Sequence, residues 1–380
     1  MLHRPGGHYD RRVVDRAGTE AATARVSLQD VAERAGVSVA TASRSLRGLA
    51  KVSPETRERV LAAARELAYT TTLPAAPEFA PGPRRTVAVI VPFVTRWFFT
   101  TVTAAAVDRL RENGYDVLLY HLGSADVRDD FFARMPLAGR VDGILVLSAP
   151  LNEEHTLALR ALDLPFVTVG TTVPSVPAVG IDAAAAARQA VNHLIHLRHE
   201  RVGLLLGEAD DPRFEFAQST ERRRGCEEAL EAAGLALPDG LVASGPHGLD
   251  GGAAAMTELL ARPELPTAVF AEYDELAIGA LWALRRAGLR VPGDISVISI
   301  DDHEMATMFD LTTVAQDVRG QGRVAANLLL AELEPGSAGP REFPVLLPTR
   351  LVIRGTTAPP PATVEDPAPM SYSRGVMRHV

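Results

Sequence analysis

The chain has 380 residues, of which 47% are apolar and 23% are charged, and its formal net charge is −8. This length and composition fit a small domain followed by one large or two medium globular domains. The single cysteine, Cys226, excludes a disulfide framework within one chain and a four-cysteine metal site. Because neither a signal-peptide core nor a bilayer-spanning apolar run occurs, we expect a reduced, cytoplasmic setting and no membrane partner.

The charge is divided unevenly along the chain. Residues 1–85 hold 14 Arg and Lys against 9 Asp and Glu, whereas the remainder carries a net charge of −13. A basic N-terminal segment followed by an acidic remainder is expected if only the N-terminal segment binds nucleic-acid phosphates. Chance clustering of charged residues would give the same distribution. Residues 1–25 show no apolar period, and we expect a disordered N-terminal arm there.

Residues 26–70 read as three short helices. Ser27 is placed to cap the first helix, Gly36 breaks it with a left-handed turn, Ser38 caps the second, and Ser53-Pro54 begins the third. The expected inward positions are Val31, Ala35, Val37, Ala42, Leu46, Val60, Ala64 and Leu67. Helix, glycine turn and helix form the helix-turn-helix plan of DNA-binding domains.

The outward face of the second helix suits a major groove. Its side chains are small, hydroxyl-bearing or cationic: Val39, Ala40, Thr41, Ser43, Arg44 and Arg47. Small apolar groups meet thymine methyls there, while hydroxyl and guanidinium groups meet base edges and phosphates. An ordinary three-helix bundle with a solvated polar face is the alternative.

The sequences DVAERAGVS, TASRSL, VSPETRERV and ELAY within this stretch resemble, without a gap, the DNA-binding headpiece of the lactose-repressor (LacI/GalR) family. The resemblance implies that Ser38, Val39, Ala40, Thr41, Ser43 and Arg44 face an operator, with Val39 and Ala40 chiefly choosing its sequence. It also implies phosphate contacts by Ser27, Lys51, Ser53 and Thr56.

The linker expected over residues 71–85 is rich in proline, which favours an extended chain. It departs from the family pattern of a short hinge helix, because Thr71 and Thr72 replace Pro-Asn, Ala76 replaces an arginine and Glu78 replaces the leucine wedge. A carboxylate in a minor groove is electrostatically unfavourable. We therefore expect a different coupling between core and DNA.

From Thr86 onward, short apolar strands alternate with amphipathic helices, beginning with TVAVIVPF and ending with ISVISID. Such alternation in two successive sets predicts two doubly wound, parallel-sheet α/β subdomains, which bind ligands beyond the carboxyl ends of their strands. In detail, we expect helices over residues 99–115, 126–141, 155–164, 182–199, 218–235, 248–263 and 274–289.

The sequences RRRGCEEAL, LTTVAQD, RLVIRGTTAP and PTAVFAEYDELAIGALWALRRAGLRVPGDISVISIDD resemble the family's effector-binding core, which has the fold of the type I periplasmic binding proteins. The fold class expected is thus multidomain: a small all-α headpiece and a periplasmic-binding-protein-like core over 86–356. Three crossings near 180, 310 and 345 imply an N-subdomain of about 86–180 and 311–345 and a C-subdomain of about 181–310 and 346–356. Residues 357–380 are expected to form a mobile tail.

Motifs for catalysis are absent from the sequence: no dinucleotide fingerprint, no phosphate-binding loop and no nucleophile elbow. His196, His199 and Glu200 lack zinc-helix spacing and read as a solvated helix end. Asp301, Asp302 and His303 follow a strand, where a turn, a reactive cluster or a metal site are all conceivable. We expect no catalytic residue, no cofactor and no metal.

The resemblance implies an effector site built from separate stretches. Asp301 matches the carboxylate that accepts from effector hydroxyls, and Arg222 matches the effector arginine. Phe98 and Phe99, next to Trp97, stand at the expected cleft edge, where core packing explains at least one of the three. Tyr273 stands where many relatives have Asn or Ser, and His247 is near the family's stacking aromatic, so the effector is not named by analogy.

The sequence therefore predicts a sequence-specific DNA-binding transcriptional regulator, most simply a repressor, controlled allosterically by a small-molecule effector such as a sugar or related metabolite. We expect a homodimer, with a tetramer as the alternative, on a pseudo-palindromic double-stranded DNA operator. A regulator without effector control is the nearest rival. A small-solute-binding protein would need a signal peptide and no headpiece, and an α/β enzyme would need a phosphate loop or an activated nucleophile.

Overall fold

The computed structural model describes residues 28–46, 52–67, 84–208, 212–214, 216–334 and 344–361. The chain divides into two compact units, Met1–Pro81 and Gly82–Val380. The predicted N-terminal arm 1–25, nearly all of the linker 71–85 with its departures at Thr71, Thr72, Ala76 and Glu78, and the tail beyond residue 361 lie outside the described residues.

The first unit consists, in its described part, of three helices: α1 (Leu28–Arg34), α2 (Val39–Leu46) and α3 (Pro54–Glu66). Gly36 has the predicted left-handed backbone, with φ of 63°, and the Val37 N–H returns to the Ala32 carbonyl. The Ser38 hydroxyl accepts from the Thr41 N–H at 3.2 Å, and the Ser53 hydroxyl accepts from the Thr56 N–H at 3.2 Å. These two bonds confirm the predicted starts of α2 and α3.

A small apolar core joins the three helices. It is formed by Val31, Ala32, Ala42, Val60, Ala63 and Ala64, with Ala35, Val37, Leu46 and Leu67 packed against it. Every position predicted to face inward therefore lies in this cluster. Because most of its members are alanine or valine, the core of the unit is thin, and each larger side chain contributes much of its stability.

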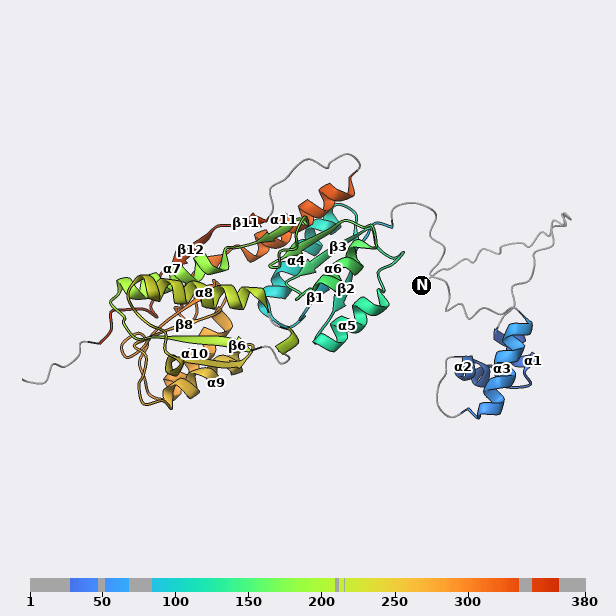
Figure 1. Ribbon diagram of the computed structural model, residues 1–380, viewed down its shortest axis with the longest axis horizontal. Coiled ribbons are helices and arrows are strands. Elements are labelled where there is room, and N and C mark those ends of the chain that lie inside the picture. The colour runs from blue at the N-terminus through green and yellow to red at the C-terminus, as the bar shows by residue number, and fades with distance from the viewer. Residues whose placement is uncertain are drawn as a thin grey trace, which may run out of the picture. The chain divides into compact units, whose positions relative to one another are not determined.

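The first sheet of the second unit has strand order β11-β5-β4-β3-β1-β2, and each neighbouring pair is parallel (Figure 1). The strands are β1 (Thr86–Val91), β2 (Asp116–His121), β3 (Gly143–Leu147), β4 (Phe166–Val169), β5 (Ala178–Gly180) and β11 (Val345–Leu346). Its helices are α4 (Trp97–Glu112), α5 (Ala125–Arg134), α6 (Glu153–Arg160) and α11 (Val318–Leu333). Residues Val87–Val91 are fully or almost fully buried, as a strand covered on both faces requires.

The second sheet has strand order β12-β10-β9-β8-β6-β7, and only the β12–β10 pair is antiparallel among the described strands. The strands are β6 (Val202–Glu208), β7 (Val242–Pro246), β8 (Ala268–Ala271), β9 (Ser296–Asp301), β10 (Thr312–Gln316) and β12 (Thr349–Val352). The helices are α7 (Ala183–His196), α8 (Ala217–Ala232), α9 (Leu249–Leu260) and α10 (Asp274–Arg286), with short 3-10 turns η1 (Pro212–Phe214) and η2 (Asp239–Leu241).

Both faces of the second sheet are covered. Leu204 packs in one cluster with residues of α7 and α8, and its neighbour Leu205 packs in another with residues of α9 and α10. Successive strand residues point to opposite faces, so this division places one helix pair on each side. The predicted pair of doubly wound α/β subdomains is confirmed.

The chain passes between the sheets three times: after β5, after β10 and between β11 and β12. The second crossing lies later than predicted. The boundaries implied by the family resemblance put residues 311–345 in the first subdomain, but β10 pairs with β9 and β12, so the chain leaves the second sheet only at Asp317. Asp317 caps α11 by accepting from the Gly320 N–H at 2.6 Å. Helix α11 itself is not among the helices predicted from the sequence.

Two further expectations need correction. The helix predicted over 126–141 ends at Arg134, because Met135 takes a left-handed φ of 39° directly before Pro136. Thr357 and Ala358, predicted to belong to a mobile tail, are instead bound to the second half of the core: the Thr357 hydroxyl bonds His193, and the Ala358 backbone bonds Ser296. No helix in the described part of the chain combines the length and hydrophobicity that crossing a bilayer requires.

Candidate functional site

The predicted DNA-reading positions lie on and around α2 in the first unit. Val39 is 44% exposed, Ser38 is exposed, and the Ser38 and Thr41 hydroxyls are 2.9 Å apart. Ala40, Ser43 and Arg44 lie on α2, and Ser53 and Thr56 are at the start of α3. Ser27, Arg47 and Lys51 fall outside the described residues. Where described, these positions form a surface of small and hydroxyl-bearing groups.

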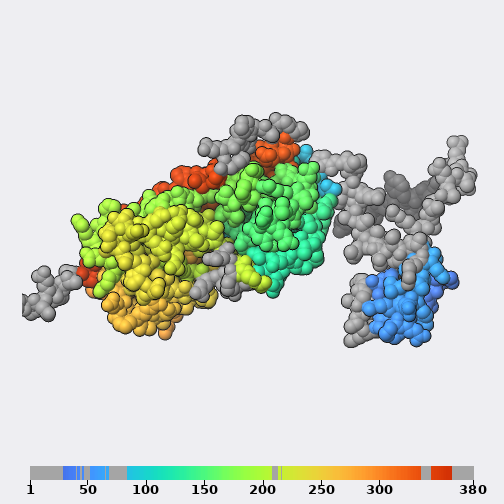
Figure 2. All heavy atoms as spheres, viewed as in Figure 1, coloured from blue at the N-terminus to red at the C-terminus, as the bar shows by residue number. Residues whose placement is uncertain are grey.

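The second unit contains a pocket at the carboxyl ends of the strands of both sheets, the position where doubly wound folds bind ligands. It holds about 710 Å³ of empty space, part of it open to solvent. In Figure 2 the green first-sheet half and the yellow and orange second-sheet half adjoin each other. The pocket is lined by Arg96, Phe98, Phe99, Ser148, Gly170, Ile181, Phe216, Gln218, Ser219, Arg222, His247, Glu272, Tyr273, Glu275, Asp301, Gln316 and Gln321.

All six residues predicted for the effector site line this one pocket: Phe98, Phe99, Arg222, His247, Tyr273 and Asp301. They come from the start of α4, from α8, from the segments that follow β7 and β8, and from the last residue of β9. Trp97 instead packs on His303, with 4.6 Å between ring centroids. The fold thus brings together residues more than 200 positions apart in the sequence.

Arg222 is almost fully buried and is held by the protein on one side. Its Nη1 donates to the Glu272 carbonyl oxygen at 2.8 Å, and its Nη2 lies 3.6 Å from Asp301 Oδ1. Its buried Nε–H has no hydrogen-bond partner among the described residues. An unsatisfied buried donor costs free energy, so a bound molecule with an acceptor would be favoured here.

Carboxyl groups crowd the pocket floor. Burial raises the pKa of Asp301 to about 6 and also raises the pKa of Glu272 and Glu275, while the nearby Arg222 guanidinium opposes the shift for Asp301 and Glu272. Beneath the pocket, burial and then repulsion by Asp301 raise the pKa of Asp274 to about 7. Asp274 accepts from the Ser299 and Thr313 hydroxyls and from the His303 N–H.

Asp301, Asp302 and His303 do not form the common cluster that the sequence allowed. Asp301 faces the pocket and accepts from Gln316 at 2.6 Å, whereas Asp302 pairs with Arg354 at 2.6 Å. The His303 ring packs on Trp97 and accepts from the Met305 N–H. In the described ranges no group of three or more His, Cys, Asp or Glu side chains is arranged to hold a metal ion.

His247 and Tyr273 form one wall of the pocket as a stacked pair. Their ring centroids are 5.5 Å apart, and His247 Nδ1 lies 2.5 Å from the Tyr273 hydroxyl. Burial lowers the pKa of His247 to about 3, so the imidazole is neutral at neutral pH. A Cβ at Gly207 would clash with both side chains, which is why only glycine fits beside them.

Comparisons with known proteins agree with this architecture. Residues 27–72 match the family described as "Bacterial regulatory proteins, lacI family", and residues 191–357 match a "Periplasmic binding protein-like domain". The chain is 33% identical over 311 residues to the HTH-type transcriptional repressor CytR of Escherichia coli (strain K12), covering 81% of this chain and 89% of CytR. The chain belongs to the lacI family.

Two solved structures of this family are similar enough to the chain to show that it has the same fold. The transcriptional regulator CelR–cellobiose complex is 32% identical, covers 88% of this chain and 100% of that one, and gives a TM-score of 0.64. The lac repressor dimer bound to operator and the anti-inducer ONPF is 28% identical, covers 88% and 99%, and gives 0.65. This lacI-family chain is a DNA-binding transcriptional regulator, and CytR, CelR and the lac repressor are regulators, not enzymes.

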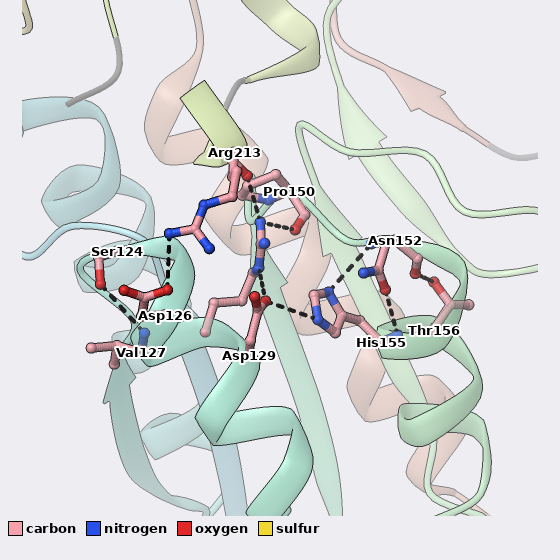
Figure 3. Close-up of polar contacts among 10 residues, drawn as sticks. Ser124, Asp126, Val127, Asp129, Pro150, Asn152, His155, Thr156 and Arg213 are labelled. Carbon is pink, nitrogen blue, oxygen red and sulfur yellow. Dashed lines mark hydrogen bonds and ion pairs between the residues drawn. The ribbon is translucent and has the colours of Figure 1, made fainter. Parts of the chain in front are cut away.

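Segment η1, from the second half of this lacI-family core, reaches into the first. Phe214 is 2% exposed and packs with Phe216 in the core of the first sheet, with Phe93 within 6.0 Å of both rings. In Figure 3 Arg213 points toward Asp126 of α5, with Nη2 2.9 Å from Oδ1. The buried Arg128 donates to the Pro150 and Arg213 carbonyl oxygens. Phe216 also lines the pocket, where its ring centroid lies 5.7 Å from that of His247.

The polar contacts beside η1 are structural. Asp129 accepts from Arg128 at 2.9 Å and lies 3.3 Å from His155 (Figure 3). His155 is buried, stacks on Phe132 at 4.3 Å and completes the capping box of α6 with Asn152. Burial lowers the pKa of His155. This cluster therefore anchors α5 and α6 at the edge of the first sheet.

For one histidine the sequence-based interpretation is wrong. The pattern places His199 at a solvated helix end, but it is 1% exposed and bonds the Thr267 hydroxyl at 2.9 Å and the Ala358 carbonyl at 2.8 Å. Its contacts come from segments 68 and 159 positions away, which the local pattern could not indicate. His196, in contrast, is exposed as expected.

Sequence reasoning also missed several pocket residues, chiefly Arg96, Phe216, Glu272, Glu275 and Gln316. A signal existed for the two glutamates, because they follow the buried strand β8 as Asp301 ends the buried strand β9. For Arg96 and Phe216, which lie in loops before α4 and α8, the sequence offered no such signal. Gln316 bridges Asp301 to Gln321 of α11 by two hydrogen bonds.

Proposed function

We propose that this protein represses transcription by binding an operator through α2 and that a small molecule in the core pocket sets the strength of that binding. One observation carries the proposal: a helix-turn-helix unit is joined to a core in which strand ends of both sheets line a ligand-sized pocket. The base-reading residues proposed are Ser38, Val39, Ala40, Thr41, Ser43, Arg44 and Arg47, and the phosphate-binding residues are Ser27, Lys51, Ser53 and Thr56.

Control by the small molecule follows from the position of the pocket. Residues of both halves of the core line the pocket, so a molecule bound there contacts both halves. It therefore favours the relative arrangement of the two halves that binds it more tightly. The proposed contacts are Phe98, Phe99, Arg222, His247, Tyr273 and Asp301. The structures of CelR with cellobiose and of the lac repressor with operator support both parts of the proposal, and the latter is a dimer. We propose a homodimer on a pseudo-palindrome.

Operator binding is tested by selecting retained sequences from a random DNA pool and measuring their affinity by gel shift. Arg44→Ala should weaken the selected sequence by about tenfold or more, because a bidentate base contact is worth about 1–3 kcal/mol. The matched control is Arg140→Ala, an exposed arginine of the other unit, which should bind as the wild type does. Equal retention by both variants would show that α2 does not read the operator.

The pocket is tested by thermal shift with small molecules, since a ligand that binds only the folded state raises its stability. The stabilisation found with any ligand should disappear in Arg222→Ala. Arg223→Ala, at the next and exposed position of α8, is the control and should respond as the wild type does. Stabilisation that survives in Arg222→Ala would place the ligand elsewhere.

A further inference from the structure

A second cavity adjoins the pocket beside the first turns of α8. This outer cavity holds about 1470 Å³ of empty space, part of it open to solvent, and Thr220 and Arg224 of α8 are among the residues that line it. Five residues line both the outer cavity and the pocket: Ser148, Gly170, Ile181, Phe216 and Gln218. These five residues therefore form the wall between the two spaces.

Both halves of the core contribute to this wall, and a hydrogen bond joins them across it. Ser148 and Gly170 directly follow β3 and β4 of the first sheet, whereas Gln218 lies in the first turn of α8. Gln218 Nε2 donates to the Gly170 carbonyl oxygen at 3.0 Å. A contact between the two halves therefore closes this part of the wall.

The first-half side of this contact is rigid. Gly170 has φ of 73°, and a Cβ there would clash with the Ser148 hydroxyl oxygen, so only glycine fits. The Ser148 hydroxyl in turn donates to the Val169 carbonyl oxygen at 3.1 Å. Close packing thus fixes the oxygen that accepts from Gln218.

Phe216 is fixed as well, whereas Gln218 can move. The Phe216 ring centroid lies 6.0 Å from those of Phe93 and Phe99. It also lies 5.9 Å from the centroid of Phe214, so moving Phe216 would disrupt aromatic packing in the core of the first sheet. Gln218 is half-buried, its unbranched side chain can rotate, and the hydrogen bond that must break joins two neutral groups.

We infer that Gln218 is a gate between the outer cavity and the pocket. While its amide bonds Gly170, the wall is closed, and a molecule in the pocket is separated from the outer cavity. When the side chain turns away, the two spaces join and a small molecule passes between them. The inference rests on the proposed function, because it concerns how the ligand of that same pocket enters and leaves.

The gate is tested by the accessibility of introduced thiols, which requires no ligand. Of the two spaces, Ser219 lines the pocket and Thr220 lines the outer cavity. Ser219→Cys and Thr220→Cys therefore place one thiol on each side of the wall. The native Cys226 is buried, and burial raises the pKa of its thiol to about 12, so it reacts slowly with N-ethylmaleimide.

In the full-length protein, N-ethylmaleimide should modify the Ser219→Cys variant more slowly than the Thr220→Cys variant. Adding Gln218→Ala should accelerate modification of Ser219→Cys about threefold to tenfold, because losing one hydrogen bond shifts the opening equilibrium by about this factor. The rate for Thr220→Cys should stay unchanged. Gln218→Met keeps the length of the side chain but cannot donate, and it should accelerate modification of Ser219→Cys as well.

The matched control is Glu275→Ala, which shortens a side chain in another wall of the pocket and should alter neither rate. Equal rates for the two thiol variants, or an acceleration that is absent from either Gln218 variant, would overturn the inference. Acceleration by Glu275→Ala alone would place the entrance at the start of α10 and would overturn it too. Circular dichroism establishes that each variant folds.

Failure of this inference differs from failure of the proposed function. If the thiol rates change as expected but no small molecule alters operator affinity, the gate stands and the regulatory proposal fails. If a small molecule alters operator affinity while the Gln218 variants leave the thiol rates unchanged, the regulatory proposal stands and the gate fails.

Discussion

At the scale of single residues, the pocket is built on strained backbone positions at strand ends. Asp301 ends β9 with φ of 138°, and Ser148 follows β3 with φ of 43°, both in the left-handed region that favours glycine. Such conformations cost about 1–3 kcal/mol each and persist only where the surroundings hold them. Asp301 is held by Gln316 and Arg222, and Ser148 by its bond to the Val169 carbonyl.

The neutral state of His247 gives the protein a defined pH dependence. An unfolded imidazole takes up its proton near pH 6.5, and the folded one near pH 3, so between these values the unfolded state binds more protons. Stability is therefore lost as pH falls below 6.5, by at most about 1.4 kcal/mol per pH unit for this group. As pH falls from 6.5 to 4.5, the urea midpoint of unfolding should decrease less steeply in His247→Gln than in the wild type. Parallel plots of midpoint against pH would contradict the lowered pKa of His247.

At the scale of elements, α7 and α8 pack closely because a glycine lies at their contact. A Cβ at Gly225 would clash with the Ala184 carbonyl oxygen, so the helices approach each other only with glycine there. Gly225→Ala should cost about 1–3 kcal/mol through overpacking. The matched control is Gly240→Ala, where the added methyl meets no atom within 4 Å, and its urea unfolding curve should stay close to that of the wild type. Equal curves for both variants would show that the helices separate freely.

Segment η1 ties the two halves of the core together through the side chain of Phe214. Phe214 is buried in the core of the first sheet although it follows β6 of the second. Phe214→Ala should cost about 3–5 kcal/mol, the usual loss for a buried phenylalanine. Phe309→Ala, at a phenylalanine that is 40% exposed, should cost far less in the same chemical denaturation experiment. A small effect of Phe214→Ala would mean that η1 does not anchor the first half.

At the scale of the whole molecule, each of the two compact units has a core of its own, and we expect them to unfold separately. Val60→Ala should cost the first unit about 2 kcal/mol, because it removes a fully buried side chain from a cluster with few large members. Calorimetry should show a lower unfolding temperature for that unit, while the transition of the second unit and its response to ligand stay unchanged. Operator binding, measured by gel shift, should become weaker. Leu61→Ala, at a position 39% exposed, is the control. A single transition that shifts as a whole would show that the units are coupled.

The sequence by itself determined the helices of the first unit and the alternation of strands and helices in the second. These features depend on local signals: Ser38 and Ser53 as caps, Gly36 as a turn, and the apolar period that put Val31 and Val60 in one core. Of the six pocket residues, Arg222, His247 and Tyr273 were named only through a family resemblance, because no local pattern distinguishes, for example, Arg222 from a surface arginine.

Only the tertiary structure decided which other residues meet at the pocket. Arg96, Phe216, Glu272 and Glu275 come from three segments whose convergence depends on strand order, and His199 is buried by residues 68 and 159 positions away. The unpaired donors of Arg222 and His247 are likewise properties of packing, since each depends on which neighbours already occupy the other atoms. Local periodicity fixes an element and its buried face, but the polar contacts and shifted pKa values of the pocket arise where distant strand ends meet.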